Sequence, residues 1–121
     1  MGLVVRLKRP PGNDDLRQFA KLFDEVDCIF TPTTPITAPK IGQTNLEIRG
    51  VDEEVRAAAT RFTRILNALG APAISIPCGF SLSGLPIGLQ IIAAARQEDR
   101  LLHAAAAMED AMALPVRYPQ V

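Results

Sequence analysis

Apolar residues recur at helical spacing in three parts of the chain. Residues 14–24 have apolar side chains at positions i, i+3, i+4 and i+7, and Asn13 before them favours an N-cap. The same spacing predicts a helix from Asp52 to Leu69, with Gly70 placed to end it. A third helix is predicted over 98–114. Five of its side chains are expected to face the core: Leu101, Leu102, Ala105, Met108 and Met112.

Short apolar runs rich in β-branched residues predict strands between these helices. The first, Val26–Phe30, is expected to be buried and to end at the prolines of the segment 31–35. From there to Gly50 the sequence has no periodicity, which predicts a long irregular loop and therefore a functional or disordered segment.

Two further strands are predicted in the second half of the chain. Ala73–Ile76 is expected to end at Pro77, and Pro86–Ala93 follows a turn at residues 81–84. The short connection predicts that these two strands are antiparallel neighbours.

This order of elements predicts an α/β fold with a partial mixed sheet and flanking helices. Three strands form a thin sheet, which suggests that the complete fold has more. The segment 1–13 is basic and ends in a Pro-Pro-Gly run, so we interpret it as an N-terminal arm, and residues 14–121 as the folded part.

Composition narrows the classes of function. Thirteen basic residues balance thirteen acidic ones, which gives no reason to expect nucleic acid or a membrane surface as a partner. No apolar run is long enough to span a bilayer, so a cytoplasmic location is predicted. The two cysteines, Cys28 and Cys78, are expected to be free, and with one histidine they leave no metal site; no cofactor is predicted.

Three segments in order resemble the amidase-signature family of hydrolases. Residues 27–35 (DCIFTPTTP), 67–80 (NALGAPAISIPCGF) and 84–92 (GLPIGLQII) are similar to three family segments of the same apolar, proline and glycine pattern. The resemblance covers roughly residues 14–112. It implies the C-terminal part of the family's fold, in enzymes that include general amidases and the glutamine-hydrolysing subunit of the tRNA-dependent amidotransferase.

The resemblance implies a catalytic set that these residues do not contain. Family members use a nucleophilic serine, a second serine and a lysine, with a Gly/Ser-rich loop that holds the oxyanion. This sequence has no such loop, none of its serines lies in a nucleophile loop, and its lysines lie outside any Ser-rich surroundings. We therefore predict no catalytic residue in this chain, and expect the N-terminal part of the family's fold to supply all three.

Five polar residues are candidates for a substrate pocket. Thr31, Thr33 and Thr34 lie in a proline-rich turn after a strand, where hydroxyls either line a cleft or cap the loop. Asn67 either bonds loop carbonyls, the favoured interpretation, or contributes to the pocket. Thr60 stands where the resemblance implies an acidic residue in glutamine-using members, which weakens any prediction of glutamine specificity.

Three functional hypotheses remain. The first is the C-terminal portion of an amidase-family hydrolase, inactive alone, with a small amide as substrate only in the complete enzyme. The second is an interaction module that pairs with a separate N-terminal amidase half or forms a homo-oligomer through its open sheet. The third, a thiol enzyme built on Cys28 or Cys78, is disfavoured because no base is near either thiol in sequence.

Overall fold

The structure, a computed structural model, describes residues 12–116 of the chain. The predicted arm, residues 1–13, lies almost wholly outside the described part. Helix α1 (Asn13–Lys21) continues into a 3₁₀ turn, η1 (Leu22–Asp24), as predicted. Its N-cap is Gly12 rather than Asn13, because the Gly12 N–H donates to Asp15 Oδ2 at 2.9 Å.

The main sheet has three antiparallel strands in the order β1–β5–β4. β4 (Ala73–Phe80) and β5 (Pro86–Ala93) form the predicted antiparallel pair, and β1 (Cys28–Pro32) pairs with the other side of β5. β4 continues past Pro77, contrary to the prediction, with a register shift between Pro77 and Gly79. The predicted α/β class, with a partial sheet and flanking helices, is confirmed.

Pro32 and Pro77, the prolines of the two outer strands, lie where a missing N–H costs no ladder bond. The Thr33 N–H donates to the Gly88 oxygen at 3.0 Å, and alternation along β1 then turns the backbone of Pro32 away from β5. On the opposite edge the Ala93 N–H donates to the Pro72 oxygen, so the same alternation turns Pro77 outward. β1 is therefore a half-exposed edge strand, and not the buried strand that was predicted.

The main core lies between this sheet and α4 (Glu98–Met112), which packs against β4 and β5. Its buried members are Ile76, Ile91, Ala93, Leu101 and Ala105. Met108 and Met112 pack against this core as predicted, whereas Leu102 is 60% exposed and was wrongly assigned to it.

The predicted loop before residue 50 ends in a second, two-stranded sheet. β2 (Asn45–Ile48) pairs antiparallel with β3 (Val51–Glu54) around a two-residue turn. Arg49 and Gly50 both have positive φ, 52° and 80°, which is the backbone that a tight hairpin requires. The prediction of an irregular loop up to Gly50 was therefore wrong for its last part.

The helix predicted from Asp52 to Leu69 begins later and is divided in two. α2 (Val55–Ala59) and α3 (Arg61–Leu69) meet at Thr60, whose φ and ψ of −98° and 1° depart from helical values. The Thr60 hydroxyl donates to the Arg56 oxygen at 2.9 Å, a back-bond that bends helices. Gly70 ends α3 in the left-handed conformation, as predicted.

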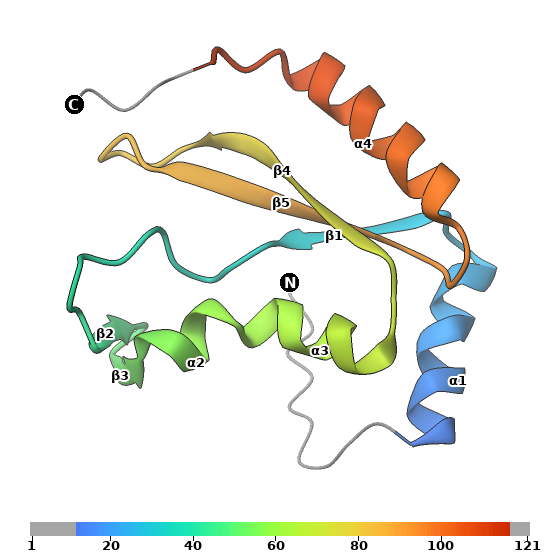
Figure 1. The fold of residues 1–121 in the computed structure, drawn as a ribbon, viewed down its shortest axis with the longest axis horizontal. Helices are drawn as coiled ribbons and strands as arrows, with labels where there is room; N and C mark the ends of the chain where they lie inside the picture. The colour runs from blue at the N-terminus through green and yellow to red at the C-terminus, as the bar shows by residue number, and fades with distance from the viewer. Residues whose placement is uncertain (1–11, 117–121) are drawn as a thin grey trace.

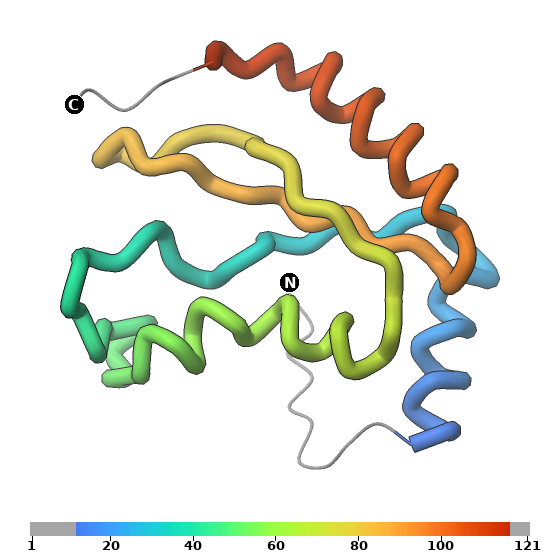
Figure 2. Tube along the Cα trace, viewed as in Figure 1, coloured from blue at the N-terminus to red at the C-terminus, as the bar shows by residue number. Residues whose placement is uncertain are grey.

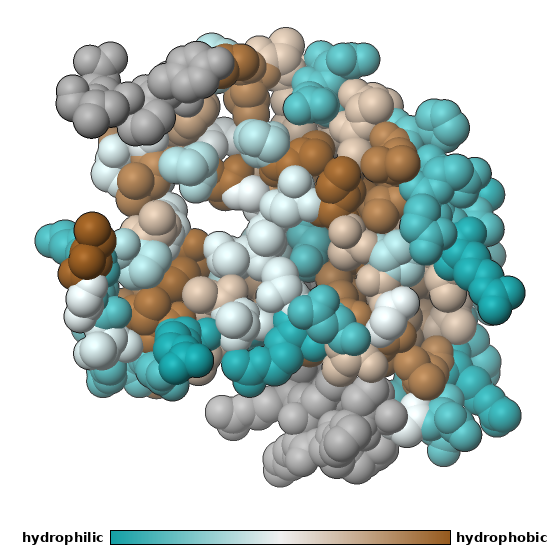
Figure 3. All heavy atoms as spheres, in the orientation of Figure 1, coloured by the Kyte–Doolittle hydropathy of each residue, from teal (hydrophilic) through white to brown (hydrophobic). Residues whose placement is uncertain are grey.

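The elements form three layers. α4 covers one face of the sheet, and α2 with α3 lies on the other side (Figure 1). Figure 2 shows the chain between β1 and β2 running along the end of the molecule to reach that second helical layer. In the space-filling view, openings remain between the sheet and the α2–α3 layer (Figure 3). In residues 12–116 no helix is long and apolar enough to cross a membrane.

Candidate functional site

Four polar side chains line up across the sheet on the face turned away from α4. They come from all three strands, because Ser75 of β4 and Thr31 of β1 both pair with Gln90 of β5, and Thr33 follows Thr31 on the same face. We call Thr31, Thr33, Ser75 and Gln90 the polar row. The layer formed by α2 and α3 lies on that side of the sheet (Figure 1).

Gln90 is the buried member of the polar row. Gln90 is 4% exposed, and its side-chain Nε2 donates a hydrogen bond to Thr31 Oγ1 at 3.0 Å. Leaving a buried carboxamide without a hydrogen-bond partner lowers the stability of the fold. The bond between Gln90 and Thr31 therefore holds the Gln90 side chain in place and links β5 to β1. Gln90 therefore presents its remaining polar atom in one orientation.

Thr33 and Ser75 meet above Gly88, the residue of β5 that lies between them. Their hydroxyl oxygens are 2.5 Å apart, and either can be the donor. A Cβ at position 88 would lie 2.7 Å from Thr33 Oγ1 and 2.8 Å from Ser75 Oγ. Glycine at this position is therefore required for the two hydroxyls to bond over the strand.

The structure brings two of the five predicted pocket residues together. Thr31 and Thr33 share the polar row, whereas the Thr34 hydroxyl donates to the Ile36 oxygen at 2.6 Å within its own loop. Thr34 thus has the loop-capping geometry that was the alternative to pocket lining. A pocket role for any of the three stays a prediction.

Thr60 and Asn67 lie apart from the polar row, on the α2–α3 layer. The Thr60 hydroxyl donates to the Arg56 oxygen and accepts from Arg64 Nη2 at 2.7 Å. Asn67 is exposed, and within the described part of the chain its side chain has no hydrogen-bond partner; its main-chain oxygen accepts from the Gly70 N–H. The loop bond that we favoured for Asn67 is not seen.

The polar row consists of three hydroxyls and one carboxamide, and none of its four side chains is ionisable at neutral pH. Ser75 Oγ bonds another hydroxyl, Thr33 Oγ1, and among residues 12–116 no lysine or histidine side chain bonds either of the two. Cys78 is half-buried and its thiol faces the Ile87 oxygen at 3.5 Å. Among residues 12–116 no three His, Cys, Asp or Glu side chains gather as metal ligands.

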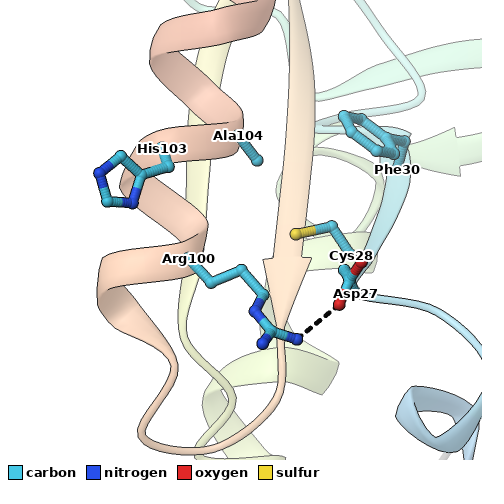
Figure 4. A pocket seen from close by; sticks show the side chains of 6 residues that line it. All are labelled: Asp27, Cys28, Phe30, Arg100, His103 and Ala104. Atoms are coloured by element: carbon cyan, nitrogen blue, oxygen red, sulfur yellow. Dashed lines mark hydrogen bonds and ion pairs between the residues drawn. The ribbon is translucent and has the colours of Figure 1, made fainter.

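A shallow, open depression lies on the opposite face of the sheet, between β1 and α4. Its volume is about 650 Å³, and it is lined by Asp27, Cys28, Phe30, Arg100, His103 and Ala104. Figure 4 shows the His103 ring pointing away from the Cys28 sulfur, toward solvent, and the Arg100 guanidinium bound to Asp27 at 2.5 Å. Cys28 is thus near a histidine in space without a bond to it, so the arrangement is not that of an activated thiol.

The sequence interpretation missed the members of the polar row outside the proline-rich turn. Neither Gln90 nor Ser75 was among the candidate residues that the sequence singled out. The signal was a two-residue alternation: Gly88 and Gln90 alternate with apolar residues, and Thr31 and Thr33 are separated by Pro32. The register between strands, which joins these residues, is not readable from spacing alone.

Comparison with known proteins identifies relatives across most of the chain. The Amidase family profile matches residues 13–102. The fatty acid amide hydrolase of Medicago truncatula is 43% identical over 94 residues, which are 78% of this chain and 16% of that protein. The glutamyl-tRNA(Gln) amidotransferase of Brevibacillus brevis has a related subunit that is 40% identical over 106 residues, 87% of this chain and 20% of the relative. The chain thus spans about a fifth of the length of these relatives.

Solved structures give the same relationship at the level of fold. A 6-aminohexanoate cyclic dimer hydrolase superposes with a TM-score of 0.72 and 35% identity, over 88% of this chain and 25% of the other. The corresponding amidotransferase subunit of Thermotoga maritima gives 0.61 and 35% identity, over 80% and 19%. The predicted kinship of these strands with part of a larger fold is confirmed.

Proposed function

The chain belongs to the amidase family, and from this premise we propose that it supplies the C-terminal portion of a hydrolase that cleaves carbon–nitrogen bonds of amides. The relatives that it matches are enzymes named for amides or for glutamyl-tRNA(Gln). Because the match covers about a fifth of their length, the rest of the machinery belongs to sequence outside these 121 residues.

We also propose that this polypeptide alone does not hydrolyse amides. The observation that carries it is the environment of Ser75, the serine on the polar row: its hydroxyl bonds Thr33, and no lysine or histidine among residues 12–116 bonds that pair. Hydrolysis of an amide needs a nucleophile next to a proton acceptor and donors for the oxyanion. The family's Gly/Ser-rich loop, which would provide them, has no counterpart in the sequence.

The complete enzyme is proposed to act on a small amide. Thr60 carries no charge, so it offers no carboxylate to the amino group of a glutamine substrate. This disfavours glutamine and favours amides without a charged amino group close to the cleaved bond. The pocket candidates for that substrate remain Thr31, Thr33, Thr34, Thr60 and Asn67, and a cytoplasmic location stays a prediction from the sequence.

A graft tests this function directly. The matched segment of the Brevibacillus brevis subunit is replaced by residues 13–121 of this chain, and hydrolysis of an aliphatic amide, an aryl amide and glutamine is measured. We expect the graft to hydrolyse at least one simple amide, and the isolated chain to hydrolyse none. A folded graft without activity on any of them, or turnover by the isolated chain that a Ser75→Ala variant abolishes, would contradict the proposal.

A second role, an interaction module, is supported by the open architecture of the chain. Both outer strands of the sheet, β1 and β4, have one edge without a partner strand in the described part of the chain. Such edges pair with other chains unless they are blunted. The partner is proposed to be a separate N-terminal amidase portion, with a homo-oligomer as the alternative.

A further inference from the structure

We propose that a stripe of exposed polar side chains on α2 and α3 binds an anionic group, and that this group is the carboxylate of an amide substrate. The arginine stripe, as we call it, consists of Arg56, Thr60, Arg64 and Asn67. The inference rests on the proposed function and deepens it by naming a substrate class, an amide that carries a carboxylate close to the amide group. Thr60 and Asn67, two of the pocket candidates from the sequence, belong to the stripe.

The members of the arginine stripe lie on one face because helical hydrogen bonds continue through the junction of α2 and α3. The Thr60 N–H donates to the Arg56 oxygen at 3.2 Å, and the Arg64 N–H donates to the Thr60 oxygen at 2.9 Å. These three residues are thus successive neighbours at spacing i, i+4, and Asn67 follows Arg64 at i+3. All four residues are exposed, and Figure 3 shows hydrophilic side chains over both helices. A ligand in solution can therefore reach them.

The stripe carries positive charge that no nearby acidic residue balances. The whole sequence is neutral, yet residues 55–97 contain four arginines and no Asp or Glu. Arg61, on the same helix as Arg64, forms an ion pair with Glu53. Among residues 12–116 no carboxylate forms an ion pair with Arg56 or Arg64. Two guanidinium groups on the stripe therefore remain available for an anion.

The Thr60 hydroxyl holds the Arg64 side chain in place. It accepts a hydrogen bond from Arg64 Nη2 at 2.7 Å and donates its own hydrogen to the Arg56 oxygen at 2.9 Å. An arginine that is already ordered loses less rotamer freedom when it binds a ligand than a free one. The bond to Thr60 occupies only part of the guanidinium, whose other N–H groups can still bind a carboxylate.

Asn67 provides a second contact for the same ligand. Its side chain has no hydrogen-bond partner among the described residues, and a carboxamide both donates to a carbonyl and accepts from an N–H. Asn67 lies about 4.5 Å beyond Arg64 along the helix axis. A short half-amide, with its carboxylate and its amide at opposite ends of a small carbon chain, matches this separation. The stripe thus fits an anionic amide better than a neutral one.

A titration of the full 121-residue chain tests the site without turnover. The probe is succinamate, the half-amide of succinate, with the neutral diamide succinamide and inorganic phosphate as comparisons at constant ionic strength. We expect succinamate to give saturable shifts of the Arg64 side-chain N–H resonance and of the Thr60 and Asn67 amides in nuclear magnetic resonance spectra. Succinamide should leave these resonances unchanged, and phosphate should bind more weakly than succinamate.

Matched substitutions separate the stripe from general electrostatic attraction. Arg64→Gln should weaken succinamate binding roughly tenfold or more, because a charge-assisted bidentate contact is lost. Arg96→Gln removes the same charge from an exposed residue between β5 and α4, and should change binding by less than about twofold. Thr60→Val, which frees Arg64, should weaken binding, and Thr60→Ser should restore it. Circular dichroism shows that each variant is folded.

Three results of the titration would overturn the carboxylate site. Equal shifts with succinamate and succinamide would show that the charge is not recognised. Equal effects of Arg64→Gln and Arg96→Gln would show that binding is not located at the stripe. Tighter binding of phosphate than of succinamate would assign the site to a phosphate group instead.

Kinetics of the graft separate this inference from the function on which it rests. The graft should hydrolyse succinamate with a lower KM than butyramide, and Arg64→Gln should raise the KM for succinamate alone. A graft that hydrolyses butyramide but not succinamate would overturn the inference and leave the function intact. An inactive folded graft contradicts the function, whereas the titration of the isolated chain still decides whether the stripe binds a carboxylate.

Discussion

Gln90 and Thr31 show how one hydroxyl secures a carboxamide inside an otherwise apolar strand. Three successive residues after Gln90 are buried and apolar, and Gln90 itself is 4% exposed. Its Nε2 has Thr31 Oγ1 as its partner, from a strand 59 residues away in sequence. The bond between Gln90 and Thr31 therefore requires the observed register of β1 and β5, because a shift by one residue would turn the Thr31 side chain to the other face of the sheet.

Thr31→Val should destabilise the chain by about 1–3 kcal/mol, because valine keeps the shape of threonine but leaves the Gln90 amide without an acceptor. Urea unfolding followed by circular dichroism measures this cost. Thr31→Ser retains the hydroxyl and should cost less. In a Gln90→Leu background the valine substitution should become nearly neutral, and an unchanged cost there would contradict the pairing.

The sequence predicted the role of a residue correctly where neighbouring residues determine its conformation. It did not do so where the role depends on a partner that is distant in sequence. Gly70 follows a helical apolar stripe, so its left-handed φ of 65° was predictable. Thr31 and Thr33 were singled out from their proline-rich turn. Ser75 and Gln90 were not joined to them, because only the strand register brings these residues together. Pro77 was misread as a strand end because its outward position depends on the same register.

Among the elements, the helix predicted from Asp52 shows why an apolar stripe does not fix a helix boundary. Residues 51–54 contain acidic side chains that suit a first helical turn, yet they form β3. The cause is the tight turn before them, and the Val55 N–H then donates to the Thr44 oxygen at 2.8 Å. Glu53 forms a half-buried ion pair with Arg61 that joins β3 to α3. Tertiary contacts thus outweighed the helical preference.

The β2–β3 hairpin should depend on glycine at position 50. Gly50 has a φ of 80°, which a β-branched residue adopts at a cost of roughly 1–2 kcal/mol. Gly50→Val should therefore raise the hydrogen-exchange rates of the Leu46 and Ile48 amides and leave those of β5 unchanged. Arg49→Gly is the control, because it removes the side chain from the neighbouring positive φ of 52° and should not accelerate exchange. Equal exchange in both variants would show that the turn does not hold this hairpin.

The main hydrophobic core of the described residues joins the sheet to α4. Four buried apolar residues lie outside this core: Val55, Ala58 and Leu66 on the α2–α3 layer, and Ile92 on the face of β5 turned away from α4. Openings between the layers are visible in Figure 3. Protein interiors are normally close-packed, so the weakly joined layer is expected to open first. The sequence predicted both amphipathic helices but could not show that one of them would be left loosely covered.

Leu66 and Leu101 allow this division to be tested with matched substitutions, since they are 6% and 5% exposed. Leu66→Ala should accelerate hydrogen exchange in α2 and α3 while the amides of β5 keep their protection, because its cavity lies outside the main core. Leu101→Ala should cost about 2–5 kcal/mol and accelerate exchange in β4, β5 and α4. Exchange that rises equally everywhere in both variants would mean one cooperative unit.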